Sequence, residues 1–576
     1  MARSNEVVAS LLQEYADLIS ITGGDAFRAR TYEKAARGVA GHGADLSTLD
    51  AKGLAQIPGV GKSIADKIIE YRADGRITAL EELRAKVPAG VRELMDIPGL
   101  GPAKAMALHR ELGVDSVDEL LHAIDAGRLS GLRGFGAKTA ENIRHGVDVL
   151  RRGAGRVLIS TALETAEQVV AALREVPGCV DCTYAGSLRR HRDSIGDVDI
   201  LAAAVGSAPL MAAFAQLPLV GEVIASGPTK TSIRTAGGLQ VDLRVVPPDS
   251  WGAALQYFTG SKAHNIRVRE LAVRKGFKLS EYGLFRAEDD TLIVSRTEEE
   301  VYQQLGLPWI PPTLREDRGE VAAARAGTLP ELVTEADIKG DLHTHTDLTD
   351  GVSTLAQMLA TARERGYRYY AVTDHAKNMP MQRMTDAKML AQRRKLRELG
   401  DQGRMALLHG TELNIDPDGA VDWDADFLAG FDVCVASVHS HFTQTPAELT
   451  ARFVAACRNP YVNIIGHPTT RQIGRRPAIE PDWDAVFDAA ADTGTAMEVN
   501  SFPDRLDLDD ELIWRARAKG VKFAVDSDAH STVHLANLRF GIGIAQRGWL
   551  TPADVINTWP LTRLRKFIAD KRRKLA

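Results

Sequence analysis

The middle of the chain contains the stretch Gly186-Ser187-Leu188-Arg189-Arg190, followed after five residues by Gly196-Asp197-Val198-Asp199-Ile200-Leu201. The second run is apolar apart from its aspartates, which indicates a β-strand. Residues two apart in a strand share one face, so Asp197 and Asp199 present both carboxylates to one point. A second apolar run carries the single acid Asp242 and could supply a third carboxylate.

Three converging carboxylates are suited to phosphoryl transfer. They can hold two hard cations, of which one activates a hydroxyl nucleophile and both stabilise the charge on the transferred phosphate. Gly186 and Ser187, with the two arginines that follow, would hold a polyphosphate in the same pocket. An isolated Asp-x-Asp is more often a solvated edge strand than a metal site. Gly-Ser followed by Gly-Asp-x-Asp is far more specific, and it predicts a two-metal phosphoryl-transfer site.

Three short glycine repeats lie in the first 150 residues. Each precedes a helical stretch, at 63–71, 103–112 and 138–150. Glycine permits positive φ and lets a phosphate approach the backbone, and the free N–H groups at the helix start can bind it. The repeats resemble the helix-hairpin-helix motif, although a single copy could be merely a turn between helices. The predicted DNA-binding glycines are Gly59, Gly61, Gly99, Gly101, Gly134 and Gly136.

The N-terminal region is not a basic nucleic-acid arm. Residues 1–150 contain 19 Lys plus Arg and 21 Asp plus Glu, so binding would depend on local backbone geometry. Backbone contacts to phosphate are independent of base sequence. This suits a protein that recognises DNA ends, gaps or shape.

The C-terminal half predicts a different chemistry, because nine of the 15 histidines lie between His343 and His534. Histidines and acids there follow short apolar runs, and each cluster precedes a helical segment. Such repeated strand-then-helix units, with functional residues at the strand ends, are typical of a β/α barrel. Any one of these histidines could be a packed core residue, but nine donors in one register predict metal ligands. The donors are His343, His345, Asp350, His375, Glu412, His439, His467, Asp528 and His530.

Length and composition bound the remaining possibilities. At roughly 150 residues per domain, 576 residues predict three to five domains. With 44% hydrophobic and 26% charged residues and a net charge of −5, intrinsic disorder across the chain is excluded. Four cysteines make no disulfide framework, and Cys179-x-x-Cys182 lacks the second pair of a zinc site, so a reducing cytoplasm is expected. An amphipathic N-terminus and the lack of a long apolar run argue against secretion and membrane insertion.

Residues 1 to about 317 resemble the family X DNA polymerases of the nucleotidyltransferase superfamily, and residues 338–576 resemble the polymerase-and-histidinol-phosphatase (PHP) domain. The match rests on the glycine repeats, the Gly-Ser and Asp-x-Asp pattern, and the run Tyr257-Phe258-Thr259-Gly260-Ser261-Lys262-Ala263-His264-Asn265. The implied fold is multidomain: a helical helix-hairpin-helix region, an α+β palm and thumb, and a distorted seven-stranded β/α barrel. The implied divisions are a helical DNA-binding domain (1–85), helix-hairpin-helix fingers (86–150), palm (151–250), thumb (251–317), linker (318–337) and PHP domain (338–576).

The family resemblance assigns roles in the palm and thumb. It implies that Asp197, Asp199 and Asp242 hold two Mg²⁺ or Mn²⁺ ions, and that Asp242 is also the base toward the primer 3′-hydroxyl. Gln240 departs from the arginine of animal repair members, which leaves the primer-phosphate contacts open. The implied nucleotide contacts are Arg156, Gly186, Ser187 and Arg190 for the triphosphate, Tyr257, Phe258 and Gly260 near the sugar, His264 stacked on the base, Asn265 in the minor groove and Arg269 on the template side.

Lys67 falls where some relatives form a Schiff base with a 5′-deoxyribose phosphate. A nucleophilic lysine needs a depressed pKa at neutral pH. Nothing in the sequence Ala65-Asp66-Lys67-Ile68 indicates one, and Asp66 could raise it. Lyase activity is therefore left open.

The PHP resemblance distributes the nine donors over three Zn²⁺ or Mn²⁺ ions. His343, His345, Glu412 and Asp528 would bind the first; Glu412 would bridge to a second held by His439 and His467; Asp350, His375 and His530 would hold the third. His409, His441 and His534 fit no ligand position and are interpreted as structural residues or substrate contacts.

Together the two sites predict a monomeric gap-filling DNA polymerase of repair with a metal-dependent 3′-to-5′ exonuclease or 3′-end phosphoesterase. Its partners would be gapped or nicked DNA and deoxynucleoside triphosphates. One alternative makes the barrel a small-molecule phosphatase; another makes the N-terminal half a DNA-binding adaptor with a dead palm. The complete aspartate triad argues against the adaptor, and fusion to a DNA-binding half argues against the phosphatase.

Overall fold

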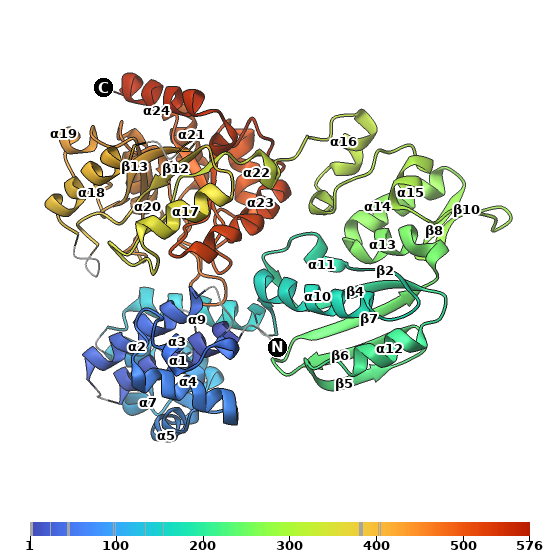
Figure 1. Cartoon of the computed structure of the whole chain (residues 1–576), viewed down its shortest axis with the longest axis horizontal. Coiled ribbons are helices and arrows are strands. Elements are labelled where there is room, and N and C mark those ends of the chain that lie inside the picture. The colour runs from blue at the N-terminus through green and yellow to red at the C-terminus, as the bar shows by residue number, and fades with distance from the viewer. Residues whose placement is uncertain are drawn as a thin grey trace.

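The computed structural model describes residues 4–22, 25–42, 46–95, 97, 100–132, 134–153, 155–379, 384–400, 403 and 405–575. The chain forms three lobes (Figure 1). The N-terminal helices are drawn in blue, the palm and thumb in green, and the C-terminal barrel in yellow to red.

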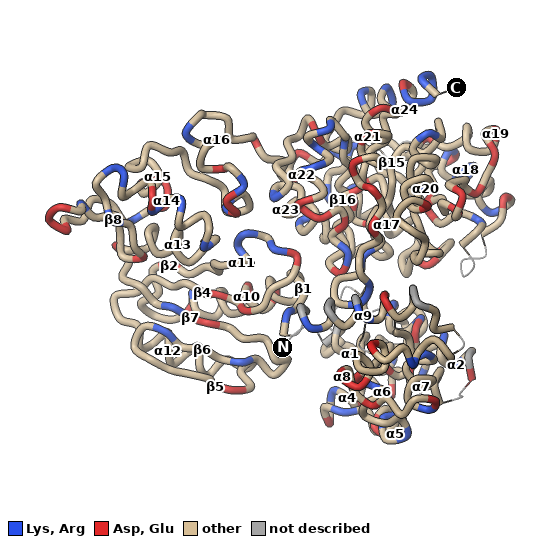
Figure 2. The backbone as a smooth tube through the Cα atoms, turned by 180° about the vertical axis from the view of Figure 1, so that it is seen from behind, with Lys and Arg blue, Asp and Glu red and all other residues tan. Residues whose placement is uncertain are grey.

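The N-terminal lobe is built from helices joined by turns, and its described residues contain no strand. Apolar residues on α1 recur at helical spacing and are buried, for example Val8, Leu12, Tyr15 and Ile19, so α1 packs its apolar face inward. Acidic and basic residues are interspersed over the lobe, and neither sign forms a continuous face in the view from behind (Figure 2). Its helices are α1 (Ser4–Ile21), α2 (Ala26–Ala40), α3 (Ala51–Leu54), α4 (Lys62–Asp74), α5 (Thr78–Lys86), α6 (Ala89–Met95), α7 (Pro102–Leu112), α8 (Val117–Asp125) and α9 (Ala137–Gly153).

The palm is built on a mixed five-stranded sheet in the order β2-β4-β7-β6-β5. Its central pair, β4 and β7, is parallel, and the other pairs are antiparallel. Buried residues of α10 and α12 belong to the same apolar core as residues of the sheet. The elements are β1 (Val157–Leu158), α10 (Ile159–Arg174), β2 (Cys179–Tyr184), α11 (Gly186–Arg189), β3 (Ser194–Ile195), β4 (Asp197–Ala204), α12 (Ala208–Ala215), β5 (Val220–Ser226), β6 (Lys230–Thr235) and β7 (Gln240–Val246).

The thumb follows as helices and a three-stranded antiparallel sheet in the order β10-β9-β8. Its own apolar core includes Val268, Leu271 and Tyr302. The elements are α13 (Trp251–Thr259), α14 (Lys262–Arg274), β8 (Phe277–Ser280), β9 (Gly283–Arg286), β10 (Leu292–Val294) and α15 (Glu298–Gln304). Helix α16 (Glu320–Ala326) follows in the predicted linker, and its Ala324 packs in the same apolar core.

The C-terminal lobe confirms the predicted distorted seven-stranded barrel. Strands β11 to β17 pair in sequence order and all pairs are parallel. A parallel bridge between Thr344 and Ala529 brings the two edges together just beyond β11 and β17. The elements are β11 (Gly340–Asp341), α17 (Leu355–Glu364), β12 (Tyr369–Val372), α18 (Asp386–Leu399), β13 (Ala406–Asn414), α19 (Ala425–Leu428), β14 (Val433–Ser437), α20 (Pro446–Arg458), β15 (Ile464–Ile465), α21 (Trp483–Thr493), β16 (Ala496–Asn500), α22 (Asp510–Ala518), β17 (Lys522–Asp526), α23 (Leu538–Arg547) and α24 (Leu561–Leu575).

Local sequence explains where the barrel helices begin. Side chains of Thr354, Thr385, Asp424, Thr445 and Asp509 each accept a backbone N–H of the following helix as N-caps. Within the barrel, strand residues share an apolar cluster with buried side chains from the C-terminal segment. Polar residues at the carboxyl ends of the strands are thereby left to build a site.

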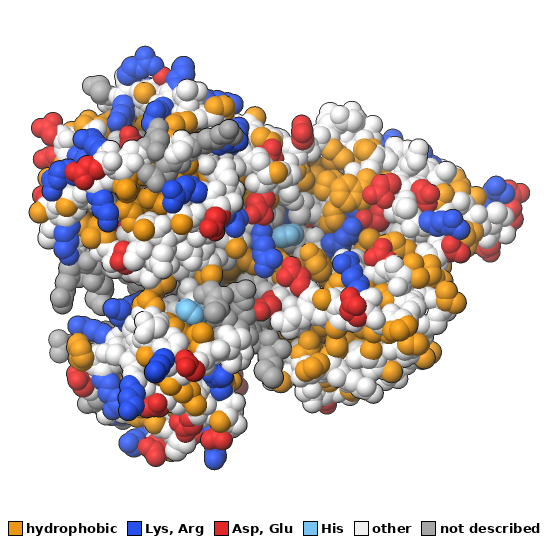
Figure 3. Space-filling view, in the orientation of Figure 1, with side chains coloured by type: hydrophobic (Ala, Val, Ile, Leu, Met, Phe, Trp, Pro, Cys, Tyr) orange, Lys and Arg blue, Asp and Glu red, His pale blue; other side chains and the backbone are white. Residues whose placement is uncertain are grey.

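The barrel touches both other lobes, as the space-filling view shows (Figure 3). Arg471 of the barrel pairs with Asp193 of the palm at 3.1 Å, and Arg539 pairs with Glu167 at 3.3 Å. In the N-terminal lobe, Gly41 lies against Val352 and Ser531. Among the described helices, none is long and apolar enough to cross a membrane.

Candidate metal centres and DNA-binding turns

The palm sheet brings the three predicted aspartates together. In the parallel pairing of β4 with β7, Asp199 lies opposite Asp242. Asp197 is two residues earlier on β4 and therefore on the same face. One oxygen from each of the three carboxylates lies within 4.8 Å of the others, which is close enough to share metal ions.

Two features require glycine at position 186, beside the triad: its backbone conformation and the close approach of the Asp199 carboxylate. Its φ is +59°, and a Cβ there would lie 2.2 Å from Asp199 Oδ2. A side chain at this position would displace the carboxylate, so the predicted Gly-Ser turn serves to let the chain pass close to the metal ligands.

The surroundings of the triad shift the pKa values of Asp199 and Asp242 in opposite directions. Burial, together with the charges of Asp197 and Asp242, raises the pKa of Asp199 to about 6. Burial would also raise the pKa of Asp242, but hydrogen bonds to its carboxylate, led by that from Lys230, outweigh burial and lower it. Lys230 Nζ lies 2.7 Å from Asp242 Oδ2, and Gln240 Nε2 donates to Oδ1 at 3.1 Å. Asp242 is therefore held ionised, as a base or a metal ligand requires.

One predicted nucleotide contact, Phe258, lies beside the triad. A pocket lined by Asp199, Lys230, Asp242, Arg244 and Phe258 opens beside it. The Arg244 guanidinium lies over the Phe258 ring, with its Cζ atom 4.6 Å from the ring centroid.

Arg190 connects the Gly-Ser turn to the nucleotide-binding run. It donates to the Thr259 carbonyl at 2.6 Å, and a Cβ at Gly260 would lie 3.1 Å from its Nη1. Ser187, in the Gly-Ser turn, and Tyr257, in the nucleotide-binding run, are both partly exposed. Arg156 is exposed and directly precedes β1, the strand that pairs with β3, and its Nε donates to Ser194 Oγ at 3.1 Å.

His264 lies on α14, and its stacking on a base stays a prediction. Its side chain is fully buried. One ring nitrogen hydrogen-bonds Glu320 at 2.6 Å and the other hydrogen-bonds Tyr302 at 2.8 Å. The position of His264 on α14 points its ring into the thumb, toward Tyr302 and toward Glu320 of the predicted linker.

Asn265 and Arg269 lie on the same helix. Asn265 Nδ2 donates to the Tyr257 carbonyl at 2.7 Å, and its Oδ1 accepts from Gln256 at 2.8 Å. Arg269 is exposed. The minor-groove and template contacts of these two residues stay predictions.

Two of the glycine repeats have a helix start open to approach. Gly61 and Gly101 are the N-cap residues of α4 and α7, neither helix has a side-chain cap, and a Cβ at either glycine would meet nothing within 4 Å. Gly59 and Gly134 have φ of +84° and +87° and form the tight turns. Gly136 is also open. Gly99 lies outside the described residues.

Replacing both Gly61 and Gly101 with valine is expected to weaken binding to gapped DNA about tenfold or more for every sequence alike, because valine covers N–H groups that would bind phosphate. Fluorescence anisotropy with two unrelated gapped duplexes measures this. Gly206→Val is the matched control, since that palm glycine is equally open. Gly59→Val is less informative, because its Cβ would lie 2.9 Å from the backbone of Lys34 and Ala35. Unchanged affinity in the folded double variant would make the repeats structural turns.

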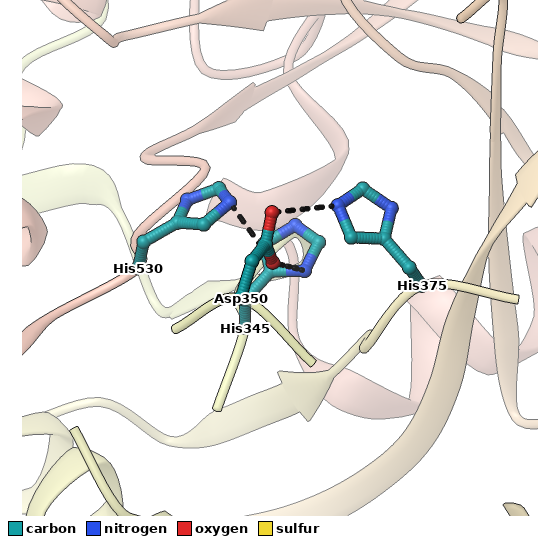
Figure 4. A group of neighbouring side chains, drawn as sticks. All are labelled: His345, Asp350, His375 and His530. Atoms are coloured by element: carbon teal, nitrogen blue, oxygen red, sulfur yellow. Dashed lines mark ion pairs between the residues drawn. The ribbon is translucent and has the colours of Figure 1, made fainter. Parts of the chain in front are cut away.

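The barrel brings all nine predicted donors to one end of its strands. Figure 4 shows His345, His375 and His530 around Asp350. The Asp350 carboxylate lies 3.9 Å from His345 Nδ1, 3.3 Å from His375 Nε2 and 3.5 Å from His530 Nε2. Ligand atoms of these four residues form one compact group.

Glu412, at the end of β13, joins the remaining donors. Its Oε1 lies 3.0 Å from both His439 Nε2 and His467 Nε2. Its Oε2 lies 3.5 Å from His343 Nε2 and 3.6 Å from His345 Nε2. Two further compact groups are His343, His345 and Asp528, and His375, Glu412 and His439. His345 and His375 thus each belong to two groups, whereas the sequence prediction gave each to one ion.

The donor atoms fit divalent cations. Buried side-chain nitrogens and oxygens normally have hydrogen-bond partners. Among the described residues, the exceptions include His343 Nε2, both ring nitrogens of His345, Asp350 Oδ1 and His375 Nδ1. Burial would raise the pKa values of Asp350, Glu412 and Asp528, but the surrounding histidines lower them well below the usual value. Ionised carboxylates and unpaired imidazoles at one point are a metal-binding donor set.

The sequence prediction missed the residues that orient these donors. Glu498 Oε1 hydrogen-bonds His343 Nδ1 at 2.7 Å, and Asn414 Oδ1 hydrogen-bonds His439 Nδ1 at 2.8 Å. Such partners fix the ring orientation of metal-bound histidines. Asn414 is the last residue of β13, and a polar residue at a strand end was an available signal. Glu498, in the middle of β16, and Lys230, beside Asp242, had no comparable one.

The three histidines without a predicted ligand position belong to none of the donor groups found among the described residues. His409 is buried and accepts from Arg393 at 3.3 Å. His534 Nδ1 accepts the backbone N–H of His530 at 3.3 Å, which supports a structural role. His441 is exposed.

Comparison with known proteins identifies the family. The chain is 34% identical over 565 residues to the DNA polymerase/3′-5′ exonuclease PolX of Bacillus subtilis, covering 97% of this chain and 98% of that protein. It belongs to the PolX family. Family descriptions match in the same order along the chain: a helix-hairpin-helix domain at 3–77, a helix-hairpin-helix tandem at 91–146, a DNA polymerase beta thumb at 254–316 and a PHP domain at 341–501.

Two other relatives each match only part of the chain. DNA polymerase lambda of Rattus norvegicus is 28% identical over 323 residues, covering 51% of this chain and 53% of that protein. A probable phosphatase of Thermoanaerobacter is 29% identical over 248 residues, covering 41% of this chain and 96% of that protein. The predicted fold class, with helix-hairpin-helix, polymerase and PHP parts, is confirmed.

Proposed function

We propose that this PolX protein fills gaps in DNA from deoxynucleoside triphosphates and degrades DNA from the 3′ end at a separate centre in its barrel. The observation that carries the proposal is the presence of two complete donor clusters, one in the palm and one in the barrel. The name of the Bacillus subtilis relative, which spans nearly the whole chain, gives the same pair of activities. A 5′-labelled gapped duplex, incubated with and without nucleotides, tests both.

In polymerisation the palm residues bind and orient. Asp197, Asp199 and Asp242 gather negative charge at one point of the sheet. Asp242 is held ionised by Lys230 and accepts the proton of the primer 3′-hydroxyl. Ser187 in α11 and Arg190 directly after this helix hold the triphosphate. Lys230 replaces, from the neighbouring strand, the positive charge that Gln240 lacks toward the primer phosphate.

In hydrolysis the barrel residues hold the scissile phosphate and exclude competing reactions. Glu412 lies between the donor groups, and its two oxygens face different histidines. Arg505 lies 3.9 Å from Asp528 and supplies a positive charge at the rim. In both sites, bound divalent cations would acidify the attacking hydroxyl or water and neutralise phosphate charge.

The donor types differ between the sites. Three carboxylates suit two Mg²⁺ or Mn²⁺ ions in the palm. The imidazole-rich barrel cluster suits three Zn²⁺ or Mn²⁺ ions, with the predicted division of ligands as part of this proposal. Metal analysis of the purified protein checks both assignments.

The second candidate function is small-molecule phosphatase activity in the barrel. The probable phosphatases, which match 41% of this chain, favour it. Activity on phosphomonoesters with none on labelled DNA would support it over the exonuclease. A DNA-binding adaptor would show neither nucleotide addition nor degradation.

Lyase activity at Lys67 is tested separately. The Lys67 ammonium is near the surface and hydrogen-bonds Ser63 Oγ at 3.3 Å rather than lying in an apolar pocket. Nucleophilic lysines are usually desolvated or placed beside another cation. We therefore expect borohydride to trap no more of a 5′-deoxyribose phosphate substrate on the wild-type protein than on Lys67→Ala. An adduct that Lys67→Ala loses would establish the lyase.

The domain divisions, a monomeric state and cytoplasmic localisation complete the proposal. All four cysteines are free, consistent with a reducing compartment. Light scattering of the purified chain measures the oligomeric state.

A further inference from the structure

We infer that the PHP domain supplies a positioning residue, Arg547, for nucleotide binding in the palm. Arg547 is the last residue of α23, and only 1% of its side chain is exposed. Its Nη1 donates to the Arg190 carbonyl at 2.8 Å. A buried side chain of the barrel therefore holds the backbone of a residue assigned to the triphosphate. This inference rests on the role of Arg190 in the proposed function.

Arg547 and Arg190 also share one carboxylate. Glu316, just before α16, accepts on Oε1 from Arg547 Nη1 at 2.8 Å and from Arg190 Nε at 3.1 Å. Glu316 is largely buried, and burial would raise its pKa, but the two arginines outweigh burial and lower it. The carboxylate is thus ionised and sits between the two guanidinium groups.

The barrel side of this cluster is fixed. Arg547 Nη2 donates to Asp510 Oδ2 at 2.7 Å, and Arg318 Nη1 lies 2.9 Å from the same oxygen. Palm and barrel are also packed tightly beside it, because a Cβ at Gly543 of α23 would lie 2.0 Å from His191 Nδ1. Arg547 therefore has little freedom to move away from Glu316.

This arrangement controls the charge available to an incoming triphosphate. Without Arg547, Glu316 would have Arg190 as its nearest guanidinium and would pair with it fully, in competition with the anionic triphosphate. With Arg547 in place, part of the carboxylate charge is satisfied by the barrel. Arg190 then keeps its second contact, to the Thr259 carbonyl, beside the nucleotide-binding run.

The cluster joins residues of the polymerase half and of the PHP domain that lie far apart in the sequence. Arg547 and Glu316 are 231 residues apart. Helix α23 comes shortly after the metal donors Asp528 and His530 in the sequence. The last turn of a PHP helix is thereby part of the support of the polymerase site.

Steady-state gap filling by Arg547→Gln tests the inference. We expect the KM for deoxynucleoside triphosphate to rise about tenfold, with kcat changed less than twofold and 3′-to-5′ degradation of single-stranded DNA unchanged. Arg539→Gln, on the same helix and in an exposed palm contact, is the matched control and should leave the KM unchanged. Thermal unfolding of each variant is followed in parallel.

Rescue separates positioning from packing. In Arg547→Gln/Glu316→Gln the competing carboxylate is gone, so the KM should return to within about threefold of wild type. Glu316→Gln alone remains measurable even where Arg547→Gln fails to fold, and it should not raise the KM. An unchanged KM in Arg547→Gln, no rescue, or a tenfold rise in Glu316→Gln would overturn the inference.

A third variant distinguishes this inference from the proposed function. Arg190→Gln should raise the KM at least as much as Arg547→Gln. If Arg190→Gln leaves the KM unchanged, the triphosphate role of Arg190 fails. If Arg190→Gln raises the KM and Arg547→Gln does not, the positioning role alone fails.

Discussion

Nucleotide addition is expected to fall at least about a thousandfold when Asp242 is replaced by alanine, because an electrostatic centre for phosphoryl transfer is removed. Asp242 lies opposite Asp199 on the neighbouring strand and is the carboxylate that Lys230 and Gln240 hold. Alanine removes the base and one shared ligand together. It also leaves the Lys230 ammonium facing the two remaining aspartates, which would disturb the charge balance further.

Extension of a 5′-labelled primer across a one-nucleotide gap measures this loss. Asp249→Ala is the matched control, because that aspartate follows the same strand but is 76% exposed and pairs with Arg296 at 3.1 Å. Its rate should stay within about twofold of wild type. Degradation of single-stranded DNA without nucleotides should survive in Asp242→Ala. Extension near the wild-type rate would exclude the palm as the polymerase site.

The sequence was sufficient to predict what depends on local periodicity. Alternation placed Asp197 and Asp199 on one face, and the β4 pattern is observed as expected. Strand-then-helix repetition in the second half predicted parallel strands with donors at their ends, and the barrel has this arrangement. Each of these inferences needed only residues within one strand or one repeat.

What depended on long-range packing could not be predicted. The direct pairing of Asp199 with Asp242 required knowing that β7 lies beside β4. His264 matched a family motif, yet whether its ring faces the nucleotide or the thumb core depends on Glu320 from another segment. Arg547 carries no motif at all, and only the docking of the barrel against the palm places it beside Glu316.

The residues that orient the barrel donors, Glu498 and Asn414, could be predicted from the sequence only in part. Asn414 ends β13, as predicted donors end their strands, whereas Glu498 lies in the middle of β16. Strand position alone could not separate a ligand from a residue that holds a ligand. The side chains make the distinction, since Glu498 faces His343 Nδ1 and leaves His343 Nε2 toward Glu412 and Asp528.

Replacement of His345 by alanine is expected to abolish 3′-to-5′ degradation of DNA. This imidazole is fully buried and belongs to two of the compact donor groups, with Nε2 3.2 Å from Asp528 Oδ1 and Nδ1 3.9 Å from Asp350 Oδ1. Its loss should therefore exceed the roughly 10- to 100-fold effect of losing an orienting partner, which is the effect expected for Glu498→Gln. Asp528→Ala should resemble His345→Ala, while Glu412→Ala should disturb all the groups that its two oxygens face.

Release of nucleotides from 5′-labelled single-stranded DNA, together with the metal content of each purified variant, measures this effect. His441→Ala is the matched control, since that histidine is exposed and outside the donor groups. Gap filling should persist in His345→Ala, because the palm carboxylates belong to a different sheet. The decisive comparison is with Asp242→Ala. If degradation continues in His345→Ala and disappears in Asp242→Ala, hydrolysis takes place in the palm, and the barrel cluster has another substrate.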